Sequence, residues 1–166
     1  TGSAAWLRAV AAISLAVGLA SCGPVKANDQ MPSITLEEAK TKVLSQQHRI
    51  IGMVPKDFVI SVFENDTSSL IPCDGDRKKW AGTGQVELNP GVDRASFLDQ
   101  VRNAVSQEPG WTAKDRRDGQ GEPTVDLLHE DGTHLIVGFW DNPESLQVDS
   151  FSACFEFPEY EYGEKY

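Results

Sequence analysis

Two histidines on either side of a tight turn are the residues best placed for metal chemistry in this chain. They begin and end the segment HEDGTH at positions 129–134. An Asp-Gly dipeptide between two apolar runs predicts a β-hairpin, because both residues tolerate positive φ. A two-residue turn would pair His129 with His134 and place both imidazoles on one face, with their Cβ atoms about 5 Å apart. Zinc usually takes three or four protein ligands, so we interpret the segment as a polar hairpin tip, with a metal site at His129 and His134 as the alternative.

The familiar catalytic motifs are absent from the sequence. It contains no G-x-S-x-G nucleophile elbow, no phosphate-binding glycine loop and no G-x-G-x-x-G dinucleotide motif. Gly82-Thr83-Gly84 is a lone Gly-x-Gly in a strand-like run, and Asp74-Gly75-Asp76 lacks the remainder of a calcium loop. His48 lies near the end of a predicted helix, where an imidazolium interacts favourably with the helix dipole. We therefore expect no cofactor and a non-catalytic role.

The N-terminal segment carries the clearest pattern in the chain. Arg8 is followed by about twelve largely apolar, uncharged residues, the length of a secretory signal peptide and too short to span a membrane comfortably. The run ends in Leu19-Ala20-Ser21-Cys22, which resembles the lipobox of bacterial lipoprotein precursors. The resemblance implies that the thiol of Cys22 receives a diacylglycerol, that a peptidase cuts before it, and that palmitate-type chains anchor the protein. We expect a lipoprotein on the extracytoplasmic face of the cell membrane.

The two remaining cysteines are expected to form a disulfide. Cys73 and Cys154 form an even pair, and an exported chain meets an oxidising compartment. Closing a loop of about 80 residues stabilises a fold by about 4 kcal/mol when the effect is attributed to chain entropy. Neither cysteine lies in a C-x-x-C motif or another nucleophile context, so we do not expect catalysis from them.

Length and composition fit one folded domain behind an export signal. The chain has 166 residues, of which 40% are hydrophobic and 24% charged, ordinary values for a globular protein. We divide it into a signal peptide (1–21), a lipidated cysteine with a tether (22–33), a single domain (34–157) and a loose acidic tail (158–166). The net charge of −10 disfavours nucleic-acid binding, which needs clustered lysine and arginine.

Two amphipathic helices are predicted. Thr35 and Glu38 form a T-x-x-E capping box ahead of an apolar stripe at helical spacing, and Gly52 supplies a stop. Asp93 caps the second helix, which ends at Pro109-Gly110. Because each helix has one apolar face, we expect both to lie on a sheet.

The rest of the domain has the two-residue period of β-strands. We expect strands over 57–64, 70–73, 80–88, 111–116, 124–130, 133–140 and 146–155. Trp80, Trp111 and Trp140 lie on these strands, and we expect them to be core residues. The order of elements predicts an α+β domain with an antiparallel sheet and two helices packed on one face.

The order of these features also resembles the mycobacterial LppA-type lipoproteins and related small actinobacterial ones. The shared features are a lipobox, a helix, a Cys followed by a strand Trp, a second helix, a Gly-Trp strand entry, an acidic-Gly hairpin and a late Cys. They cover residues 22–155. The resemblance implies a two-helix α+β fold with a disulfide and supplies no catalytic residues.

Two functions remain as hypotheses. The first is a non-catalytic binding or accessory module of the cell envelope, held in the membrane by Cys22, whose partner is an envelope protein, a lipid or a wall component. The alternative is a metal-dependent or otherwise unrecognised envelope hydrolase that uses His129 and His134.

Overall fold

The computed structural model describes residues 33–166, so the lipobox, Cys22 and nearly all of the tether lie outside the described residues. Two α-helices are present, α1 (Leu36–Ile51) and α2 (Arg94–Ser106), with a short 3-10 helix η1 (Lys56–Phe58) after α1. The predicted capping box at the start of α1 is confirmed. The Thr35 hydroxyl accepts a hydrogen bond from the Glu38 amide at 3.2 Å, and the Glu38 carboxylate accepts one from the Thr35 amide at 2.8 Å.

An eight-stranded antiparallel sheet makes up the rest of the domain. Its main path runs in the order β1-β3-β7-β6-β5-β4, and β2 and β8 pair with β3 off this path. The strands are β1 (Val59–Glu64), β2 (Leu70–Pro72), β3 (Arg77–Leu88), β4 (Trp111–Arg117), β5 (Pro123–His129), β6 (His134–Asp141), β7 (Glu144–Phe151) and β8 (Phe155–Glu156). The predicted last strand is thus two strands, because the chain leaves the sheet between β7 and β8.

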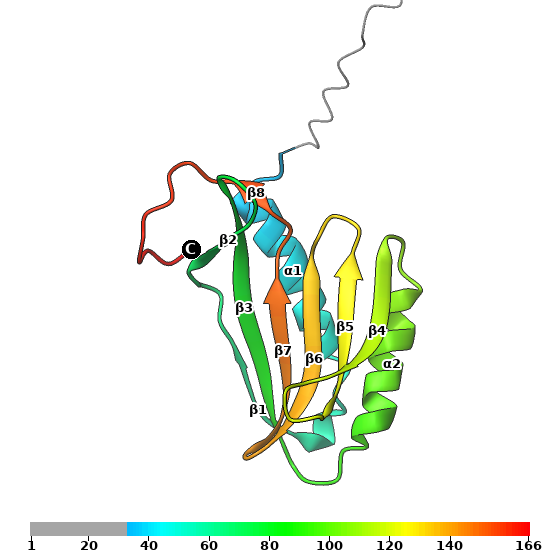
Figure 1. Ribbon diagram of the computed structural model, residues 1–166. Coiled ribbons are helices and arrows are strands. Elements are labelled where there is room, and N and C mark those ends of the chain that lie inside the picture. Colours follow the sequence, from blue (N-terminus) through cyan, green and yellow to red (C-terminus); the bar gives the residue numbers. More distant parts are fainter. Residues whose placement is uncertain (1–32) are drawn as a thin grey trace, which may run out of the picture. The chain divides into compact units, whose positions relative to one another are not determined.

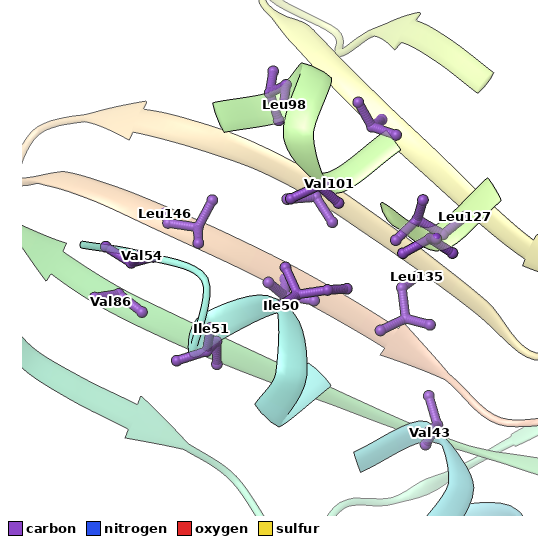
Figure 2. Close-up of a cluster of buried hydrophobic side chains, with 14 of the residues drawn as sticks. Val43, Ile50, Ile51, Val54, Val86, Leu98, Val101, Leu127, Leu135 and Leu146 are labelled. Carbon is purple, nitrogen blue, oxygen red and sulfur yellow. The ribbon is translucent and has the colours of Figure 1, made fainter. Parts of the chain in front are cut away.

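Both helices cover the same face of the sheet, as predicted (Figure 1). Helix α1 packs mainly on β3 and β7, and α2 packs on β4 and β5. Figure 2 shows that side chains of both helices and of the strands gather in one apolar cluster. Its members are almost inaccessible to solvent and include Val43, Ile50, Val101, Leu127, Leu135 and Leu146. The α+β fold with two helices on one face is therefore confirmed.

Two glycines allow close packing on the core side of β3. Trp80 is fully buried, and a methyl group at Gly82 would overlap its ring. At Gly84 an added Cβ would lie 2.6 Å from Ile51 Cδ1 and 2.9 Å from the side chain of Gln47, so α1 sits directly against the strand. The Gly-x-Gly sequence is therefore a packing feature of β3.

The predicted disulfide between Cys73 and Cys154 is present. It links the turn between β2 and β3 to the segment between β7 and β8, 81 residues apart. The bond therefore joins the first half of the domain to its last strands. In the chain-entropy model a disulfide stabilises the fold more when it closes a longer loop, and this loop is a long one.

The segment after β8 contradicts our expectation of a loose tail over 158–166. Tyr166 packs against the core, with its ring 5.0 Å from that of Phe157. Its backbone makes two hydrogen bonds of 2.9 Å with Ser68, and its carbonyl oxygen accepts one from the Trp80 indole at 3.0 Å. The prediction was wrong because it considered acidity and periodicity and neglected the aromatic side chains.

Replacing Gly82 by alanine is expected to lower the free energy of unfolding by about 1–3 kcal/mol, because the new methyl group displaces the buried Trp80 ring. Urea unfolding followed by tryptophan fluorescence measures the change. Gly119→Ala is the matched control, since nothing lies within 4 Å of a Cβ at that position. Equal stability of the Gly82→Ala and wild-type proteins would contradict this account of the packing.

Candidate functional site

The hairpin between β5 and β6 has a different register from the one we predicted. Leu128, and not His129, pairs with His134. The His129 amide donates to the Thr133 carbonyl at 2.9 Å, and Gly132, with φ of 92°, donates to the His129 carbonyl at 2.9 Å. This is the longer hairpin in which a turn is followed by a left-handed glycine. The prediction was wrong by one residue, and such a shift moves a side chain to the other face of the sheet.

His129 lies on the side of the sheet that the helices cover. Its Nδ1 is 3.1 Å from the Lys42 ammonium of α1 and 2.9 Å from the Asp131 carboxylate, and its ring contacts Trp111 edge-on at 5.1 Å. The Lys42 ammonium also donates to Asp131 at 2.5 Å. Together these groups tie the hairpin to α1.

Asp131 also stabilises the turn itself. Its Oδ1 accepts a hydrogen bond from the Thr133 amide at 2.8 Å. Partial burial raises the pKa of Asp131, but the hydrogen bonds from Lys42 and Thr133 outweigh this effect and hold the pKa well below its usual range. The carboxylate is therefore charged at neutral pH, and it holds the Lys42 ammonium.

His134 lies on the opposite, uncovered side of the sheet. Its ring stacks on Phe151 at a centroid distance of 5.8 Å, and its Nε2 is 3.5 Å from the Asp126 carboxylate. The structure therefore does not bring His129 and His134 together. Within residues 33–166, no group of three or more His, Cys, Asp or Glu side chains could hold a metal ion.

The remaining histidine takes part in a separate contact. The His48 Nε2 is 3.1 Å from the Glu64 carboxylate of β1. Glu64 also accepts a hydrogen bond from Gln47 at 2.7 Å, and Gln47 in turn accepts one from Ser150 at 2.7 Å. These groups connect α1 to β1 and β7, which agrees with a structural role for His48.

The uncovered side of the sheet is the best candidate for a binding surface. We call it the open face: the side chains of β1 and β3–β7 that alternate with the core-facing ones. Strand register places them in rows that run across neighbouring strands. One row comprises Gln85, Gln147, Gly138 and Thr124; the next comprises Thr83, Asp149, Ile136 and Asp126; the third comprises Ala81, Phe151, His134 and Leu128.

Three large apolar side chains on the open face are accessible to solvent. Leu128 is 46% exposed, Trp140 is 47% exposed, and Phe63, which pairs with Gln85, is 61% exposed. Our expectation that Trp140 is a core residue was wrong, whereas Trp80 is fully buried and Trp111 packs against the core. Residues alternate strictly between faces along a strand, so the buried Phe139 signals that Trp140 points the other way. That alternation was visible in the sequence.

Hydrogen bonds order the polar side chains of the open face. Asp149 accepts from Thr83 at 3.0 Å and from Gln147 at 2.9 Å. Gln85 donates to the buried Ser145 at 3.1 Å. These contacts restrain the side-chain amides of Gln85 and Gln147.

No family model, curated protein or solved structure matches this chain. Neither helix of the described domain is long and apolar enough to cross a membrane.

Changing Asp131 to asparagine is expected to lower the free energy of unfolding by up to about 1 kcal/mol at pH 7, because it removes a partly exposed ion pair but keeps an acceptor for the turn. The folded-state pKa is lowered, so this contribution is present above the unfolded pKa of about 3.9 and disappears as the pH falls below it. Urea unfolding at several pH values measures the difference in the free energy of unfolding between the wild type and Asp131→Asn.

Glu130→Gln is the control, since the carboxylate of Glu130 makes no ion pair within residues 33–166. The stability difference between Asp131→Asn and wild type should narrow below pH 4, whereas Glu130→Gln should show little difference at neutral pH. A difference for Asp131→Asn that stays constant with pH would contradict the proposed role of the charge.

Proposed function

We propose that the protein is a membrane-anchored, non-catalytic binding module of the cell envelope, with the open face of its sheet as the binding surface. The observation that carries this proposal is the open face itself. It presents accessible apolar groups beside amides held by hydrogen bonds, on a sheet whose other side packs against both helices. A surface of that kind suits recognition, because its side chains need little reordering on binding.

The proposal includes a lipid anchor at Cys22 on the extracytoplasmic side. Its support is the lipobox resemblance of residues 19–22 and the apolar run before them. The disulfide between Cys73 and Cys154 is consistent with this location, because such bonds persist in oxidising compartments.

The hydrolase alternative loses its geometric basis. It required both imidazoles on one face of a hairpin, but His129 contacts Lys42 of α1 whereas His134 stacks on Phe151 of the open face. No observation in the described domain favours it over the binding module.

Mass spectrometry of the protein from its native membrane is expected to find an N-terminal Cys22 that carries a diacylglycerol. A Cys22→Ser variant should instead leave the membrane fraction, because two or more acyl chains are needed for lasting attachment. Native protein with the leader intact and the Cys22 thiol unmodified would rule out the proposed anchor.

Replacing Ile136 by lysine is expected to reduce the binding of the soluble domain, residues 33–166, to isolated envelope fragments by at least tenfold. The lysine places a charged group in the middle row of the open face. Co-sedimentation with the fragments measures the bound fraction. The core residues and the disulfide described above lie within residues 33–166, which belong to one compact unit.

Gln100→Lys, on the exposed side of α2, introduces the same charge away from the sheet. This variant should bind like the wild type, and thermal melting of both variants verifies that they are folded. Equal binding by Ile136→Lys and wild type would show that the open face is not the binding surface.

A further inference from the structure

Of the three carboxylates on the open face, Asp126, Asp149 and Glu87, only Asp126 has a cationic partner among residues 33–166. Asp126 lies 2.7 Å from the Arg116 guanidinium and 3.5 Å from His134. Asp149 accepts two side-chain hydrogen bonds, and Glu87 accepts one from Ser61 at 3.1 Å. The two carboxylates without a cationic partner repel a phosphate-rich polymer or an anionic membrane. An anionic ligand is therefore disfavoured, whereas an uncharged one is compatible with this face.

The groups that remain to bind a ligand are neutral hydrogen-bonding groups. The side chains of Gln85 and Gln147 lie opposite each other on β3 and β7. Each uses its amide nitrogen for an internal hydrogen bond, Gln85 to Ser145 and Gln147 to Asp149. Their carbonyl oxygens are thereby left as acceptors, and hydroxyl groups are suitable donors to them.

A glycine lies next to these amides and exposes its backbone on the open face. Gly138 lies opposite Gln147 on β7 and opposite Thr124 on β5, so the row contains only backbone at that point. Trp140 follows on the same strand and the same face, with nearly half of its surface exposed. A Cβ at Gly138 would lie 3.0 Å from Thr124 Cγ2, so the Thr124 methyl group borders this stretch of backbone on the β5 side.

We propose that Gly138, Trp140 and Gln147 form a binding site for a neutral polysaccharide chain. This assignment rests on the proposed function and names its ligand class. A sugar ring has apolar C–H faces and a rim of hydroxyl groups. One such ring would lie over Gly138 against the Trp140 indole and donate hydroxyl hydrogen bonds to the amide oxygens of Gln147 and Gln85.

A polysaccharide matches this face better than a folded protein does. The centres of protein interfaces are apolar and depleted of charge, whereas the middle row of the open face contains Asp149 and Asp126 beside Ile136. A lipid surface requires a continuous apolar or cationic patch, and the apolar groups here are separated by polar ones.

The test is titration of isotope-labelled residues 33–166 with two neutral probes, a β-linked N-acetylglucosamine hexasaccharide and maltohexaose, followed by NMR. The domain contains three tryptophans, and the signal that Trp140→Ala removes identifies the Trp140 indole. We expect at least one probe to shift that signal and the Gln147 side-chain amide with a dissociation constant in the millimolar range or below. Trp140→Ala and Gln147→Leu should each weaken binding at least tenfold.

Val62→Ala is the matched control. Val62 is an apolar side chain with 50% of its surface exposed, on the helix-covered side of β1, because it pairs with the buried Val86. Its removal should leave the affinity unchanged. A parallel titration with phosphatidylglycerol vesicles tests the lipid alternative.

Any one of three results would overturn the assignment. In the first, neither saccharide shifts the Trp140 signal. In the second, Val62→Ala weakens binding as much as Trp140→Ala, and in the third, vesicles shift the same signals whereas the saccharides do not. If the saccharides fail but Ile136→Lys still abolishes binding to envelope fragments, the polysaccharide site is wrong while the binding module stands. If a saccharide binds, and Trp140→Ala and Gln147→Leu each weaken that binding, the result supports both the polysaccharide site and the binding module.

Discussion

The packing of both helices on one face of the sheet is the constraint from which the other features follow. Helix α1 can sit close to β3 because Gly84 has no side chain there, and the Trp80 ring fits over Gly82 on the same strand. The core therefore forms on that side alone. Within the described domain no helix packs on the other side of the sheet, so side chains there, such as Leu128 and Trp140, are accessible to solvent.

Strand β3 is the element that connects the parts of the domain. It pairs with β1 and β7 in the main sheet and with β2 and β8 at its first residues. The disulfide from Cys73 to Cys154 closes the same end, and the Trp80 indole donates to the backbone of Tyr166 nearby. Two strands, a covalent bond and the last aromatic residue thus meet at the first residues of β3, as Figure 1 shows for β2, β8 and the final red segment.

A one-residue difference in one hairpin decides what the histidines do. With the shorter turn, His129 and His134 would share a face and could hold a ligand together. With the observed turn, His129 contributes to the contact between the hairpin and α1, and His134 becomes part of the open face beside Phe151. The chemistry of the two imidazoles is unchanged, and only the strand register separates a metal site from two structural roles.

The sequence by itself determined the local elements and the class of fold. The Thr35 capping box, the apolar stripe of α1 and the alternation along β5 to β7 act over a few residues, so they could be recognised without the structure. Pairing of Cys73 with Cys154 also followed, because only two cysteines remain once Cys22 is assigned to lipid.

Tertiary structure alone decided the hairpin register, the docking of Tyr166 and the make-up of the open face. Each depends on groups far apart in the chain: Lys42 with Asp131, Ser68 with Tyr166, and the rows of side chains that cross from β3 to β5. Strand order and register set these distances, and neither propensity nor periodicity contains that information. The arrangement of side chains on the open face is therefore a property of the assembled sheet.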